Sequence, residues 1–333
     1  MKIVVDAMGG DFAPEEIVKG SIEAALKDEI PLILVGDKEK ILKVDANLPA
    51  LSSLIEIYHT PQAITMEDKP SISLKKKKNA SIIIGARLVK EGKGDAIVSA
   101  GNTGAVVGAA LLELGEIKGI ERPAIATFWP TIGENITMLI DSGAVKDCKT
   151  KHLLQFALMG NLVAKYVFNI QNPRVGLLNI GEESTKGNAL TLETYPILAN
   201  NKNINFIGNV EGGELPGGKV DVVVCDGFTG NVVLKTGEGI ANFINTLFER
   251  EFLNYWNNNI PEGIKKIIAK IKKTLDYAEH GGGLLLGVNG ICIITHGRSN
   301  ARGIRNSIKM AYKFAKSNII QKLKENLTQN EQN

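Results

Sequence analysis

The chain has 333 residues, of which 44% are apolar, and a formal net charge of +3 at neutral pH. This length is sufficient for a large hydrophobic core, and the small net charge excludes the strongly basic composition that is typical of nucleic-acid-binding proteins. No apolar run is long enough for a membrane-spanning helix, and we expect no signal peptide.

Cysteine usage points to a reduced compartment. The three cysteines, Cys148, Cys225 and Cys292, are far apart and form no CxxC pair. This pattern favours a cytoplasmic protein and argues against a structural zinc site. The sequence also has no HExxH motif and no histidine cluster, so we predict no metal.

Short apolar runs bounded by turn residues recur along the chain and predict β-strands. These runs lie at residues 2–6, 31–36, 54–59, 95–100, 124–129, 136–141, 174–181, 204–209, 220–227 and 291–297. Most are apolar at consecutive positions, which is typical of strands that are covered on both faces.

Helical patterns separate most of these strands. They lie at residues 14–28, 72–91, 103–114, 150–168, 185–199, 230–255, 262–279 and 300–326. The alternation predicts an α/β fold with a large, mostly parallel sheet and helices on both faces, a Rossmann-like three-layer arrangement. Residues 124–129 and 136–141 instead predict a hairpin, so the sheet is expected to be mixed. We expect one catalytic domain over residues 1–333, with a helical projection around residues 240–285.

Glycine-rich polar loops follow several of the predicted strands. They read DAMGGD (6–11), SAGNTG (99–104), NIGEESTKGN (179–188), CDGFTGN (225–231) and THGRSN (295–300). Glycine lets backbone N–H groups approach a ligand closely, and a following helix offers further N–H groups to an anion. Since ligands of open α/β sheets bind at the carboxyl ends of strands, we expect these loops to meet at one edge and to bind phosphate.

Several other chemistries lack their motifs. The sequence contains no GxxxxGK[ST] phosphate loop, no GxGxxG in the loop at residues 99–104, and no GxSxG nucleophile turn. We therefore predict neither a nicotinamide cofactor nor any other.

The polar loops, taken together and in order, resemble the PlsX family, the acyl-ACP:phosphate acyltransferases of fatty acid and phospholipid synthesis. The resemblance rests on DAMGGD, SAGNTGA, RPA (122–124), the loop from Asn179 to Asn188, GNVEG (208–212), DVVVCDGFTGN (221–231) and LLGVNG (285–290) with the loop at 296–300. It implies a fold similar to those of phosphate acetyltransferase and of isocitrate and isopropylmalate dehydrogenases. It also implies a homodimer that moves a long acyl group from acyl carrier protein to inorganic phosphate.

With this reaction in view, we assign roles to individual loop residues. The predicted catalytic residues are Lys186, Asn188 and His296. The predicted phosphate-binding residues are Ser99, Gly101, Asn102, Thr103 and Gly104. The predicted substrate-binding residues are Asp6, Gly9, Gly10, Asp11, Asn179, Asp226, Thr229, Asn231 and Asn300.

Each assignment has a structural alternative. Asn102, Thr103, Asp11, Asp226 and Asn300 are also typical helix-capping residues. The alternative for Lys186 is a solvated side chain near a helix start, but a cation there opposes the helix dipole, which favours the functional assignment. A lone histidine such as His296 is more often structural.

The segment at residues 263–278 has the pattern of a basic amphipathic helix. Its apolar side chains recur with helical spacing, and lysines occupy most of the remaining positions. It is an ordinary surface helix, a docking site for the acidic carrier protein, or a contact with the membrane surface. The family resemblance implies a cytoplasmic protein that associates peripherally with the inner face of the membrane.

Two other functions stay open from the sequence. One is a nicotinamide-dependent decarboxylating dehydrogenase of the related fold, which needs clustered aspartates for a metal. The other is a non-enzymatic scaffold that senses acyl chains or phosphate at the membrane.

Overall fold

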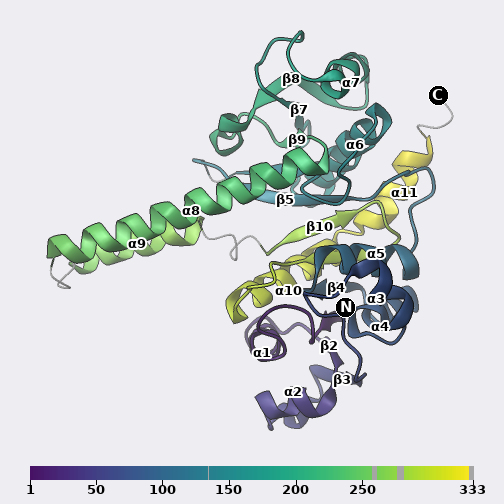
Figure 1. Ribbon diagram of the computed structural model, residues 1–333, viewed down its shortest axis with the longest axis vertical. Coiled ribbons are helices and arrows are strands. Elements are labelled where there is room, and N and C mark those ends of the chain that lie inside the picture. The colour runs from purple at the N-terminus through teal and green to yellow at the C-terminus, as the bar shows by residue number, and fades with distance from the viewer. Residues whose placement is uncertain (134, 257–260, 276–280, 330–333) are drawn as a thin grey trace.

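The computed structural model describes residues 1–133, 135–256, 261–275 and 281–329. The described residues form one sheet of eleven strands in the order β3–β2–β1–β4–β11–β10–β5–β6–β9–β7–β8 (Figure 1). The strands are β1 (Ile3–Asp6), β2 (Leu32–Gly36), β3 (Ile55–His59), β4 (Ala96–Ser99), β5 (Ala124–Pro130), β6 (Ile136–Ile140), β7 (Arg174–Asn179), β8 (Asn205–Glu211), β9 (Val222–Val224), β10 (Gly283–Leu286) and β11 (Ile291–Ile294).

The helices cover both faces of this sheet. They are α1 (Glu15–Asp28), α2 (Lys38–Val44), α3 (Pro70–Lys76), α4 (Ser81–Lys90), α5 (Thr103–Glu113), α6 (Thr150–Val167), α7 (Ala189–Ala199), α8 (Gly227–Trp256), α9 (Glu262–Leu275), α10 (Ala301–Lys316) and α11 (Ile319–Gln329), with short 3-10 helices η1 (Leu48–Leu51) and η2 (Gly212–Gly217). This arrangement confirms the α/β fold with a mixed sheet.

The strands run in two opposite directions. Strands β1, β2, β3, β4 and β11 are mutually parallel, and so are β6, β9, β7 and β8. The antiparallel pairs β11–β10, β10–β5 and β5–β6 join these two groups. The predicted hairpin of β5 and β6 is therefore confirmed. The two parallel groups, however, present their carboxyl ends at opposite edges of the sheet, so the expectation that all the polar loops meet at one edge was wrong.

One face of the sheet is covered continuously. Helix α1 packs on α10, α10 on β4 and β11, α6 on β6 and β9, and α11 on α6. Alternate strand residues fill this side, as Ala124 and Ala126 of β5 and Ile293 of β11 show. This face therefore contributes the main hydrophobic core.

The other face is covered in two separate parts. Helices α4 and α5 pack over β1, β4 and β11, where Ile125, Cys292 and Ile294 join a second core cluster. Helix α8 packs on β6, and η2 packs on β5 and β8. Leu139, Val223 and Leu215 belong to a third core cluster on this part of the face. Strands β10 and β5 lie between the two parts in the order of the sheet, and β5 also contacts η2.

Two of the predicted helices differ from the observed ones, and two observed elements were not predicted. The predicted helix at 72–91 is split into α3 and α4, and the one at 300–326 is split into α10 and α11. Asn318, between α10 and α11, has a φ of 55°, a left-handed conformation that asparagine tolerates and that ends a helix. Strand β10 and helix α2 were not predicted.

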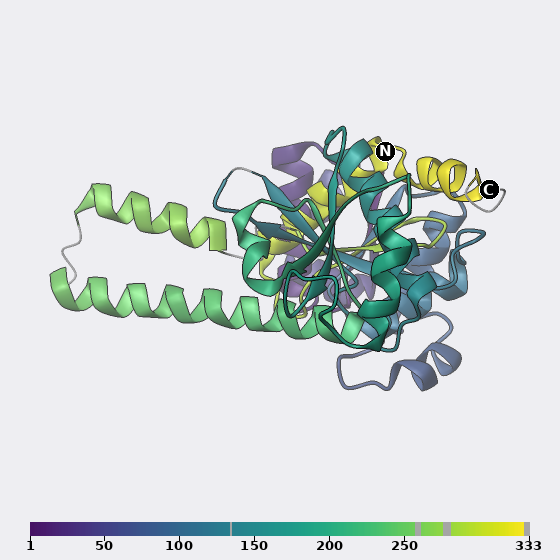
Figure 2. The ribbon, with the colours of Figure 1, turned by 90° about the horizontal axis from the view of Figure 1, so that it is seen from above.

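Helix α8 starts on the sheet and continues far beyond it, with α9 returning alongside (Figure 2). Ile264 and Ile268 of α9 are half-buried, and Lys272 forms an ion pair with Glu249 of α8. Residues 276–278 of the predicted basic helix lie outside the described part. Across the residues that the structure describes, we find no helix with the length and apolar character needed to cross a bilayer.

Candidate functional site

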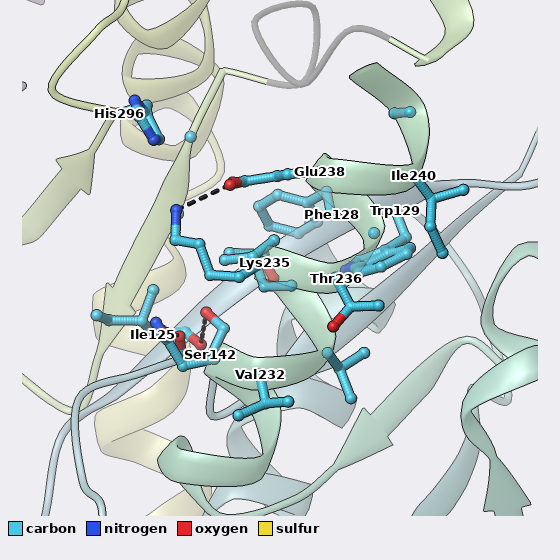
Figure 3. Close-up of a pocket in the computed structure, with 18 of the residues that line it drawn as sticks. Ile125, Phe128, Trp129, Ser142, Val232, Lys235, Thr236, Glu238, Ile240 and His296 are labelled. Carbon is cyan, nitrogen blue, oxygen red and sulfur yellow. Dashed lines mark hydrogen bonds and ion pairs between the residues drawn. The ribbon is translucent and has the colours of Figure 1, made fainter. Parts of the chain in front are cut away.

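A cavity of about 680 Å³ lies between the two groups of helices that cover this face of the sheet (Figure 3). Ile125 and Thr127 of β5 and Gly283 of β10 lie at its base, and Thr103 of α5 and the first turns of α8 lie around it. We call it the central cavity. Its lining is mostly apolar, with a few polar side chains, which is the usual composition of a small-molecule site. The lining also includes Phe128, Trp129, Ser142, Pro216, Asn231, Lys235, Glu238, Ile240 and His296.

The loops after β1 and β4 form one hydrogen-bonded unit beside this cavity. The Ser99 hydroxyl donates to the Asp6 carboxylate (2.7 Å) and accepts from the Gly101 N–H (3.0 Å). A Cβ at Gly9 would lie 2.6 Å from the Asp6 carboxylate and 2.9 Å from the Gly101 nitrogen. Glycine at position 9 is therefore what allows the two loops to approach so closely.

Asp6 is the buried charge in this unit. It is 2% exposed, and burial raises the pKa of its carboxyl, while hydrogen bonds from Ser81, Ser99 and the Met8 and Gly9 N–H groups partly oppose that shift. Asp6 binds its own loops, so it has no direct route to a phosphate in this arrangement.

Asn102 caps helix α5. Its side-chain oxygen accepts from the Gly104 and Ala105 N–H groups at 3.0 and 3.3 Å. Two of the amides assigned to phosphate, those of Gly101 and Gly104, are thus hydrogen-bonded within the loop. Of the five residues predicted to bind phosphate, Thr103 lies in the wall of the central cavity.

The loop after β11 carries His296 to the same cavity. The Gly297 carbonyl accepts from the Asp11 N–H (2.8 Å), and Arg298 lies 3.7 Å from the Asp11 carboxylate, so this loop is tied to the one after β1. Burial and the nearby Lys235 charge lower the pKa of His296. Its Nδ1 accepts from the Arg298 N–H (3.1 Å), which leaves Nε2 to carry the proton of the neutral ring.

Asn231 and Ser142 reach the cavity from the opposite edge of the sheet. The Asp141 carboxylate accepts from the backbone N–H groups of Ile125, Gly143, Ala144 and Val145 and so fixes the loop after β6. Asn231 donates to the Ser142 carbonyl at 3.1 Å. The sequence had indicated Asn231 but not Ser142, because the run DSGAV lacks the length of the other polar loops.

Two charged residues of α8 were also missed. Lys235 and Glu238 line the cavity and form an ion pair of 2.8 Å (Figure 3). They lie inside a long helix, where the search for polar loops at strand ends could not find them. Lys235 is four residues after Asn231, and residues four apart lie on the same face of a helix, so this spacing could have indicated Lys235.

Other predicted residues act as helix caps. Asp226 accepts from the Thr229 N–H and hydroxyl at 2.9 and 2.7 Å. Asn188 accepts from the Thr191 N–H, and Asn300 accepts from the Gly303 N–H, each at 3.0 Å. Asp226 and Asn300 therefore cap helices in this structure, as the alternative interpretation of the sequence predicted. Asn188 caps α7, which the sequence analysis did not predict.

Lys186 and its neighbours lie away from the central cavity. Asn179 donates to the Lys186 carbonyl (2.9 Å), and the Lys186 side chain is exposed. Lys186, Asn188 and Asn179 are not among the residues that line the central cavity. The structure therefore does not bring them together with Thr103 there.

The sequence matches the family described as fatty acid synthesis protein over residues 1–322. The chain is 48% identical over 328 residues to the phosphate acyltransferase of Dictyoglomus turgidum, with 98% of each chain covered. It is 49% identical over 321 residues to the phosphate acyltransferase of Moorella thermoacetica, with 96% of this chain and 94% of the other covered. The chain belongs to the PlsX family of phosphate acyltransferases.

Solved structures similar to this PlsX-family chain share its fold at low sequence identity. A phosphotransacetylase from Streptococcus pyogenes has a TM-score of 0.64 at 16% identity, covering 95% of this chain and 94% of the other. A branched-chain phosphotransacylase from Enterococcus faecalis has a TM-score of 0.60 at 15% identity, covering 95% and 99%. These likenesses confirm the expected relation to the phosphate acetyltransferase fold.

The three cysteines of this PlsX-family chain are poor nucleophiles. Burial raises the pKa of Cys148 and Cys292 to about 12, and that of Cys225 well above its ordinary value. Thiols with such values stay protonated at neutral pH, and the thiolate is the reactive form. No group of three or more His, Cys, Asp or Glu side chains in the described residues is placed to hold a metal ion.

Proposed function

We propose that this PlsX-family protein transfers a long-chain fatty acyl group from acyl carrier protein to inorganic phosphate, which gives acyl phosphate and the free carrier thiol. The observation that carries the proposal is the central cavity, in which apolar walls adjoin Thr103, Ser142, Lys235 and His296. An acyl phosphate has the same division into a hydrocarbon chain and an anion. The phosphate acyltransferase relatives support the same reaction.

The reaction needs little covalent chemistry from the protein. Phosphate is largely a dianion near neutral pH, because its second pKa lies at about 6 to 7. One of its oxygens attacks the thioester carbonyl carbon, the new C–O bond forms, the C–S bond breaks, and the leaving thiolate takes up a proton. The protein has to hold both reactants in line, exclude water and stabilise the oxyanion. The high pKa values of the cysteines agree with direct attack by phosphate.

Within this proposal, the polar side of the cavity binds phosphate. Thr103 is the first residue of α5, whose amino-terminal end attracts anions. Lys235 supplies a positive charge, and neutral His296 offers its Nε2–H as a donor. Lys186, Asn188 and Asn179 remain proposed site residues of the loop after β7, which has to approach the cavity if they act on the same substrate.

The direct test is an assay of the purified protein with palmitoyl-carrier thioester and labelled orthophosphate. We expect a labelled product that hydroxylamine destroys, formed together with one free thiol per acyl group. Formation of a stable acyl-enzyme before phosphate is added, or the absence of phosphate-dependent thiol release, would contradict the proposal.

Two groups of variants locate the site. We expect Thr103→Val and His296→Gln each to lower kcat/KM at least tenfold. We expect Lys186→Ala to lower turnover strongly while the protein still folds, and unchanged kinetics would remove Lys186 from the site. Lys219→Ala is the matched control, since Lys219 is an exposed lysine outside the cavity lining, and its kinetics should be those of the wild type.

We also propose that the protein acts as a homodimer in the cytoplasm and contacts the membrane surface peripherally. The exposed apolar side chains of the projecting helices, Ile240 and Phe243 of α8 with Ile267 and Ile271 of α9, support an additional partner surface. The lysines of α9 suit an anionic lipid surface or the acidic carrier protein. One catalytic domain over residues 1–333 agrees with the single continuous sheet.

A further inference from the structure

Trp129 stands on the side of the central cavity away from His296. Figure 3 shows Trp129 beside Phe128 and close to Ile240, with Lys235 and Glu238 between them and His296. The cavity thus has a polar side and an aromatic side. If the proposed reaction occurs at the polar side, an acyl chain extends toward Trp129.

The position of the Trp129 ring is set by helix α8. A Cβ at Gly237 would lie 2.1 Å from Cη2 and 2.7 Å from Cζ3 of the indole, so the ring lies directly against the helix backbone. Glycine in a helix interior costs about 1 kcal/mol relative to alanine. The close approach of Trp129 gives a physical reason for glycine at this position.

No hydrogen bond holds the ring in place. The Trp129 Nε1–H is buried and has no partner among the described residues. The indole, like Val233, also packs against the core cluster that includes Leu139, Leu215 and Val223. The ring therefore separates the cavity from that core, and packing alone fixes it.

We propose that Trp129, seated on Gly237, limits the length of the acyl chain that the central cavity accepts. This inference rests on the proposed acyltransferase function and names the residue that determines its chain-length specificity. A smaller side chain at position 129 extends the cavity toward the core under η2. A side chain at position 237 pushes the indole into the cavity and shortens it.

The test compares kcat/KM for saturated acyl-carrier thioesters of increasing even chain length, from decanoyl to stearoyl. We expect Trp129→Leu to move the optimum to longer donors and Gly237→Ala to move it to shorter ones. The ratio between neighbouring donors should change roughly tenfold, since a methylene that fits or clashes in an apolar pocket alters discrimination by about that factor. Gly239→Ala is the matched control: it lies two residues along the same helix with nothing within 4 Å of its added Cβ, so its profile should be that of the wild type.

The outcomes separate this inference from the proposed function. Unchanged ratios in both Trp129→Leu and Gly237→Ala, whatever their overall rates, would overturn the role of Trp129. If Gly237→Ala does not fold, the Trp129→Leu profile decides alone. Failure of the wild type to transfer acyl groups to phosphate would instead contradict the function.

A binding measurement tests the position of the chain without catalysis. The sequence has two tryptophans, so Trp256→Phe leaves Trp129 as the single one. We expect stearic acid to change the Trp129 emission more than decanoic acid does. Calorimetric binding of stearic acid with no change in emission would show that the chain does not reach Trp129.

Discussion

Asp6 shows how a single residue can join two loops at a cost in stability. Its carboxylate accepts from Ser99, which in turn accepts from Gly101, so it holds the loops after β1 and β4 together. Burial raises its pKa, which means that the folded protein disfavours the ionised carboxylate more than the unfolded chain does. The stability that protonated Asp6 contributes is present below the ordinary pKa of about 4 and is lost as the pH rises through the raised value.

The direction of this pKa shift predicts how the stability of the Asp6→Asn variant depends on pH. The amide keeps a polar group in place without a charge, so the stability of the variant relative to the wild type should improve as the pH rises from about 4 to 7. We expect the difference between the melting temperatures of variant and wild type to move in favour of the variant as the pH rises. Thermal unfolding across this pH range measures it, and a difference that shrinks with rising pH would contradict the assigned pKa direction.

Individual site residues were only partly predictable from sequence. Thr103, Asn231 and His296 follow strands in recognisable glycine-rich loops, and the structure places all three around the central cavity. Lys235 and Trp129 have no such signature, because one lies within a helix and the other in a strand. Their place at the cavity depends on how α8 crosses the sheet, which local sequence does not encode.

At the scale of elements, the contact between α1 and α10 depends on a small residue. A Cβ at Gly20 would lie 2.4 Å from the Ala301 carbonyl oxygen and 2.7 Å from the Ile304 Cβ. Beside this contact, Arg305 of α10 forms a two-point ion pair with Asp28 at 2.6 and 3.0 Å. The crossing of these helices is therefore fixed by steric fit and by a charged clamp.

Gly20→Ala is expected to destabilise the protein. Overpacking lowers the free energy of unfolding by about 1–3 kcal/mol, and the better helix propensity of alanine offsets at most about 1 kcal/mol of this loss. The free energy of unfolding in urea should fall, while Gly239→Ala, in an open position of α8, should leave it equal or higher. Equal stabilities of the two variants would show that α1 can shift without cost.

The alternation of strands and helices was predictable because buried strands are apolar at consecutive positions. Strand β10 was missed because its short run GLLL follows glycines. The dipeptide Asn289–Gly290, between the apolar runs of β10 and β11, is the hairpin signal that could have revealed it. Since β10 helps to reverse the strand direction, missing it also concealed that the polar loops lie at two edges.

At the scale of the whole molecule, the projecting helices offer the clearest surface for a partner. Ile267 and Ile271 are 57% and 37% exposed, although both belong to the apolar stripe of α9. An apolar stripe that is only half covered by α8 favours an additional contact.

Two paired substitutions separate the proposed contacts. We expect Ile267→Asn with Ile271→Asn to convert a dimer into a monomer in light scattering if the stripe joins two copies. Lys265→Gln with Lys266→Gln should leave the dimer intact and lower binding to vesicles that contain anionic lipid. A protein that stays dimeric and vesicle-bound in both variants would exclude this face as the partner surface.

The central place of β11 has a consequence for synthesis of the chain. Ile291–Ile294 pair with β4, and β10 pairs with β5, so the last strands to be made fill the middle of the sheet. Until they leave the ribosome, β4 and β5 each expose an unpaired strand edge, and such edges invite association with other chains. A nascent protein that stalls before residue 291 is thus a candidate client for chaperones, however complete its earlier strands and helices are.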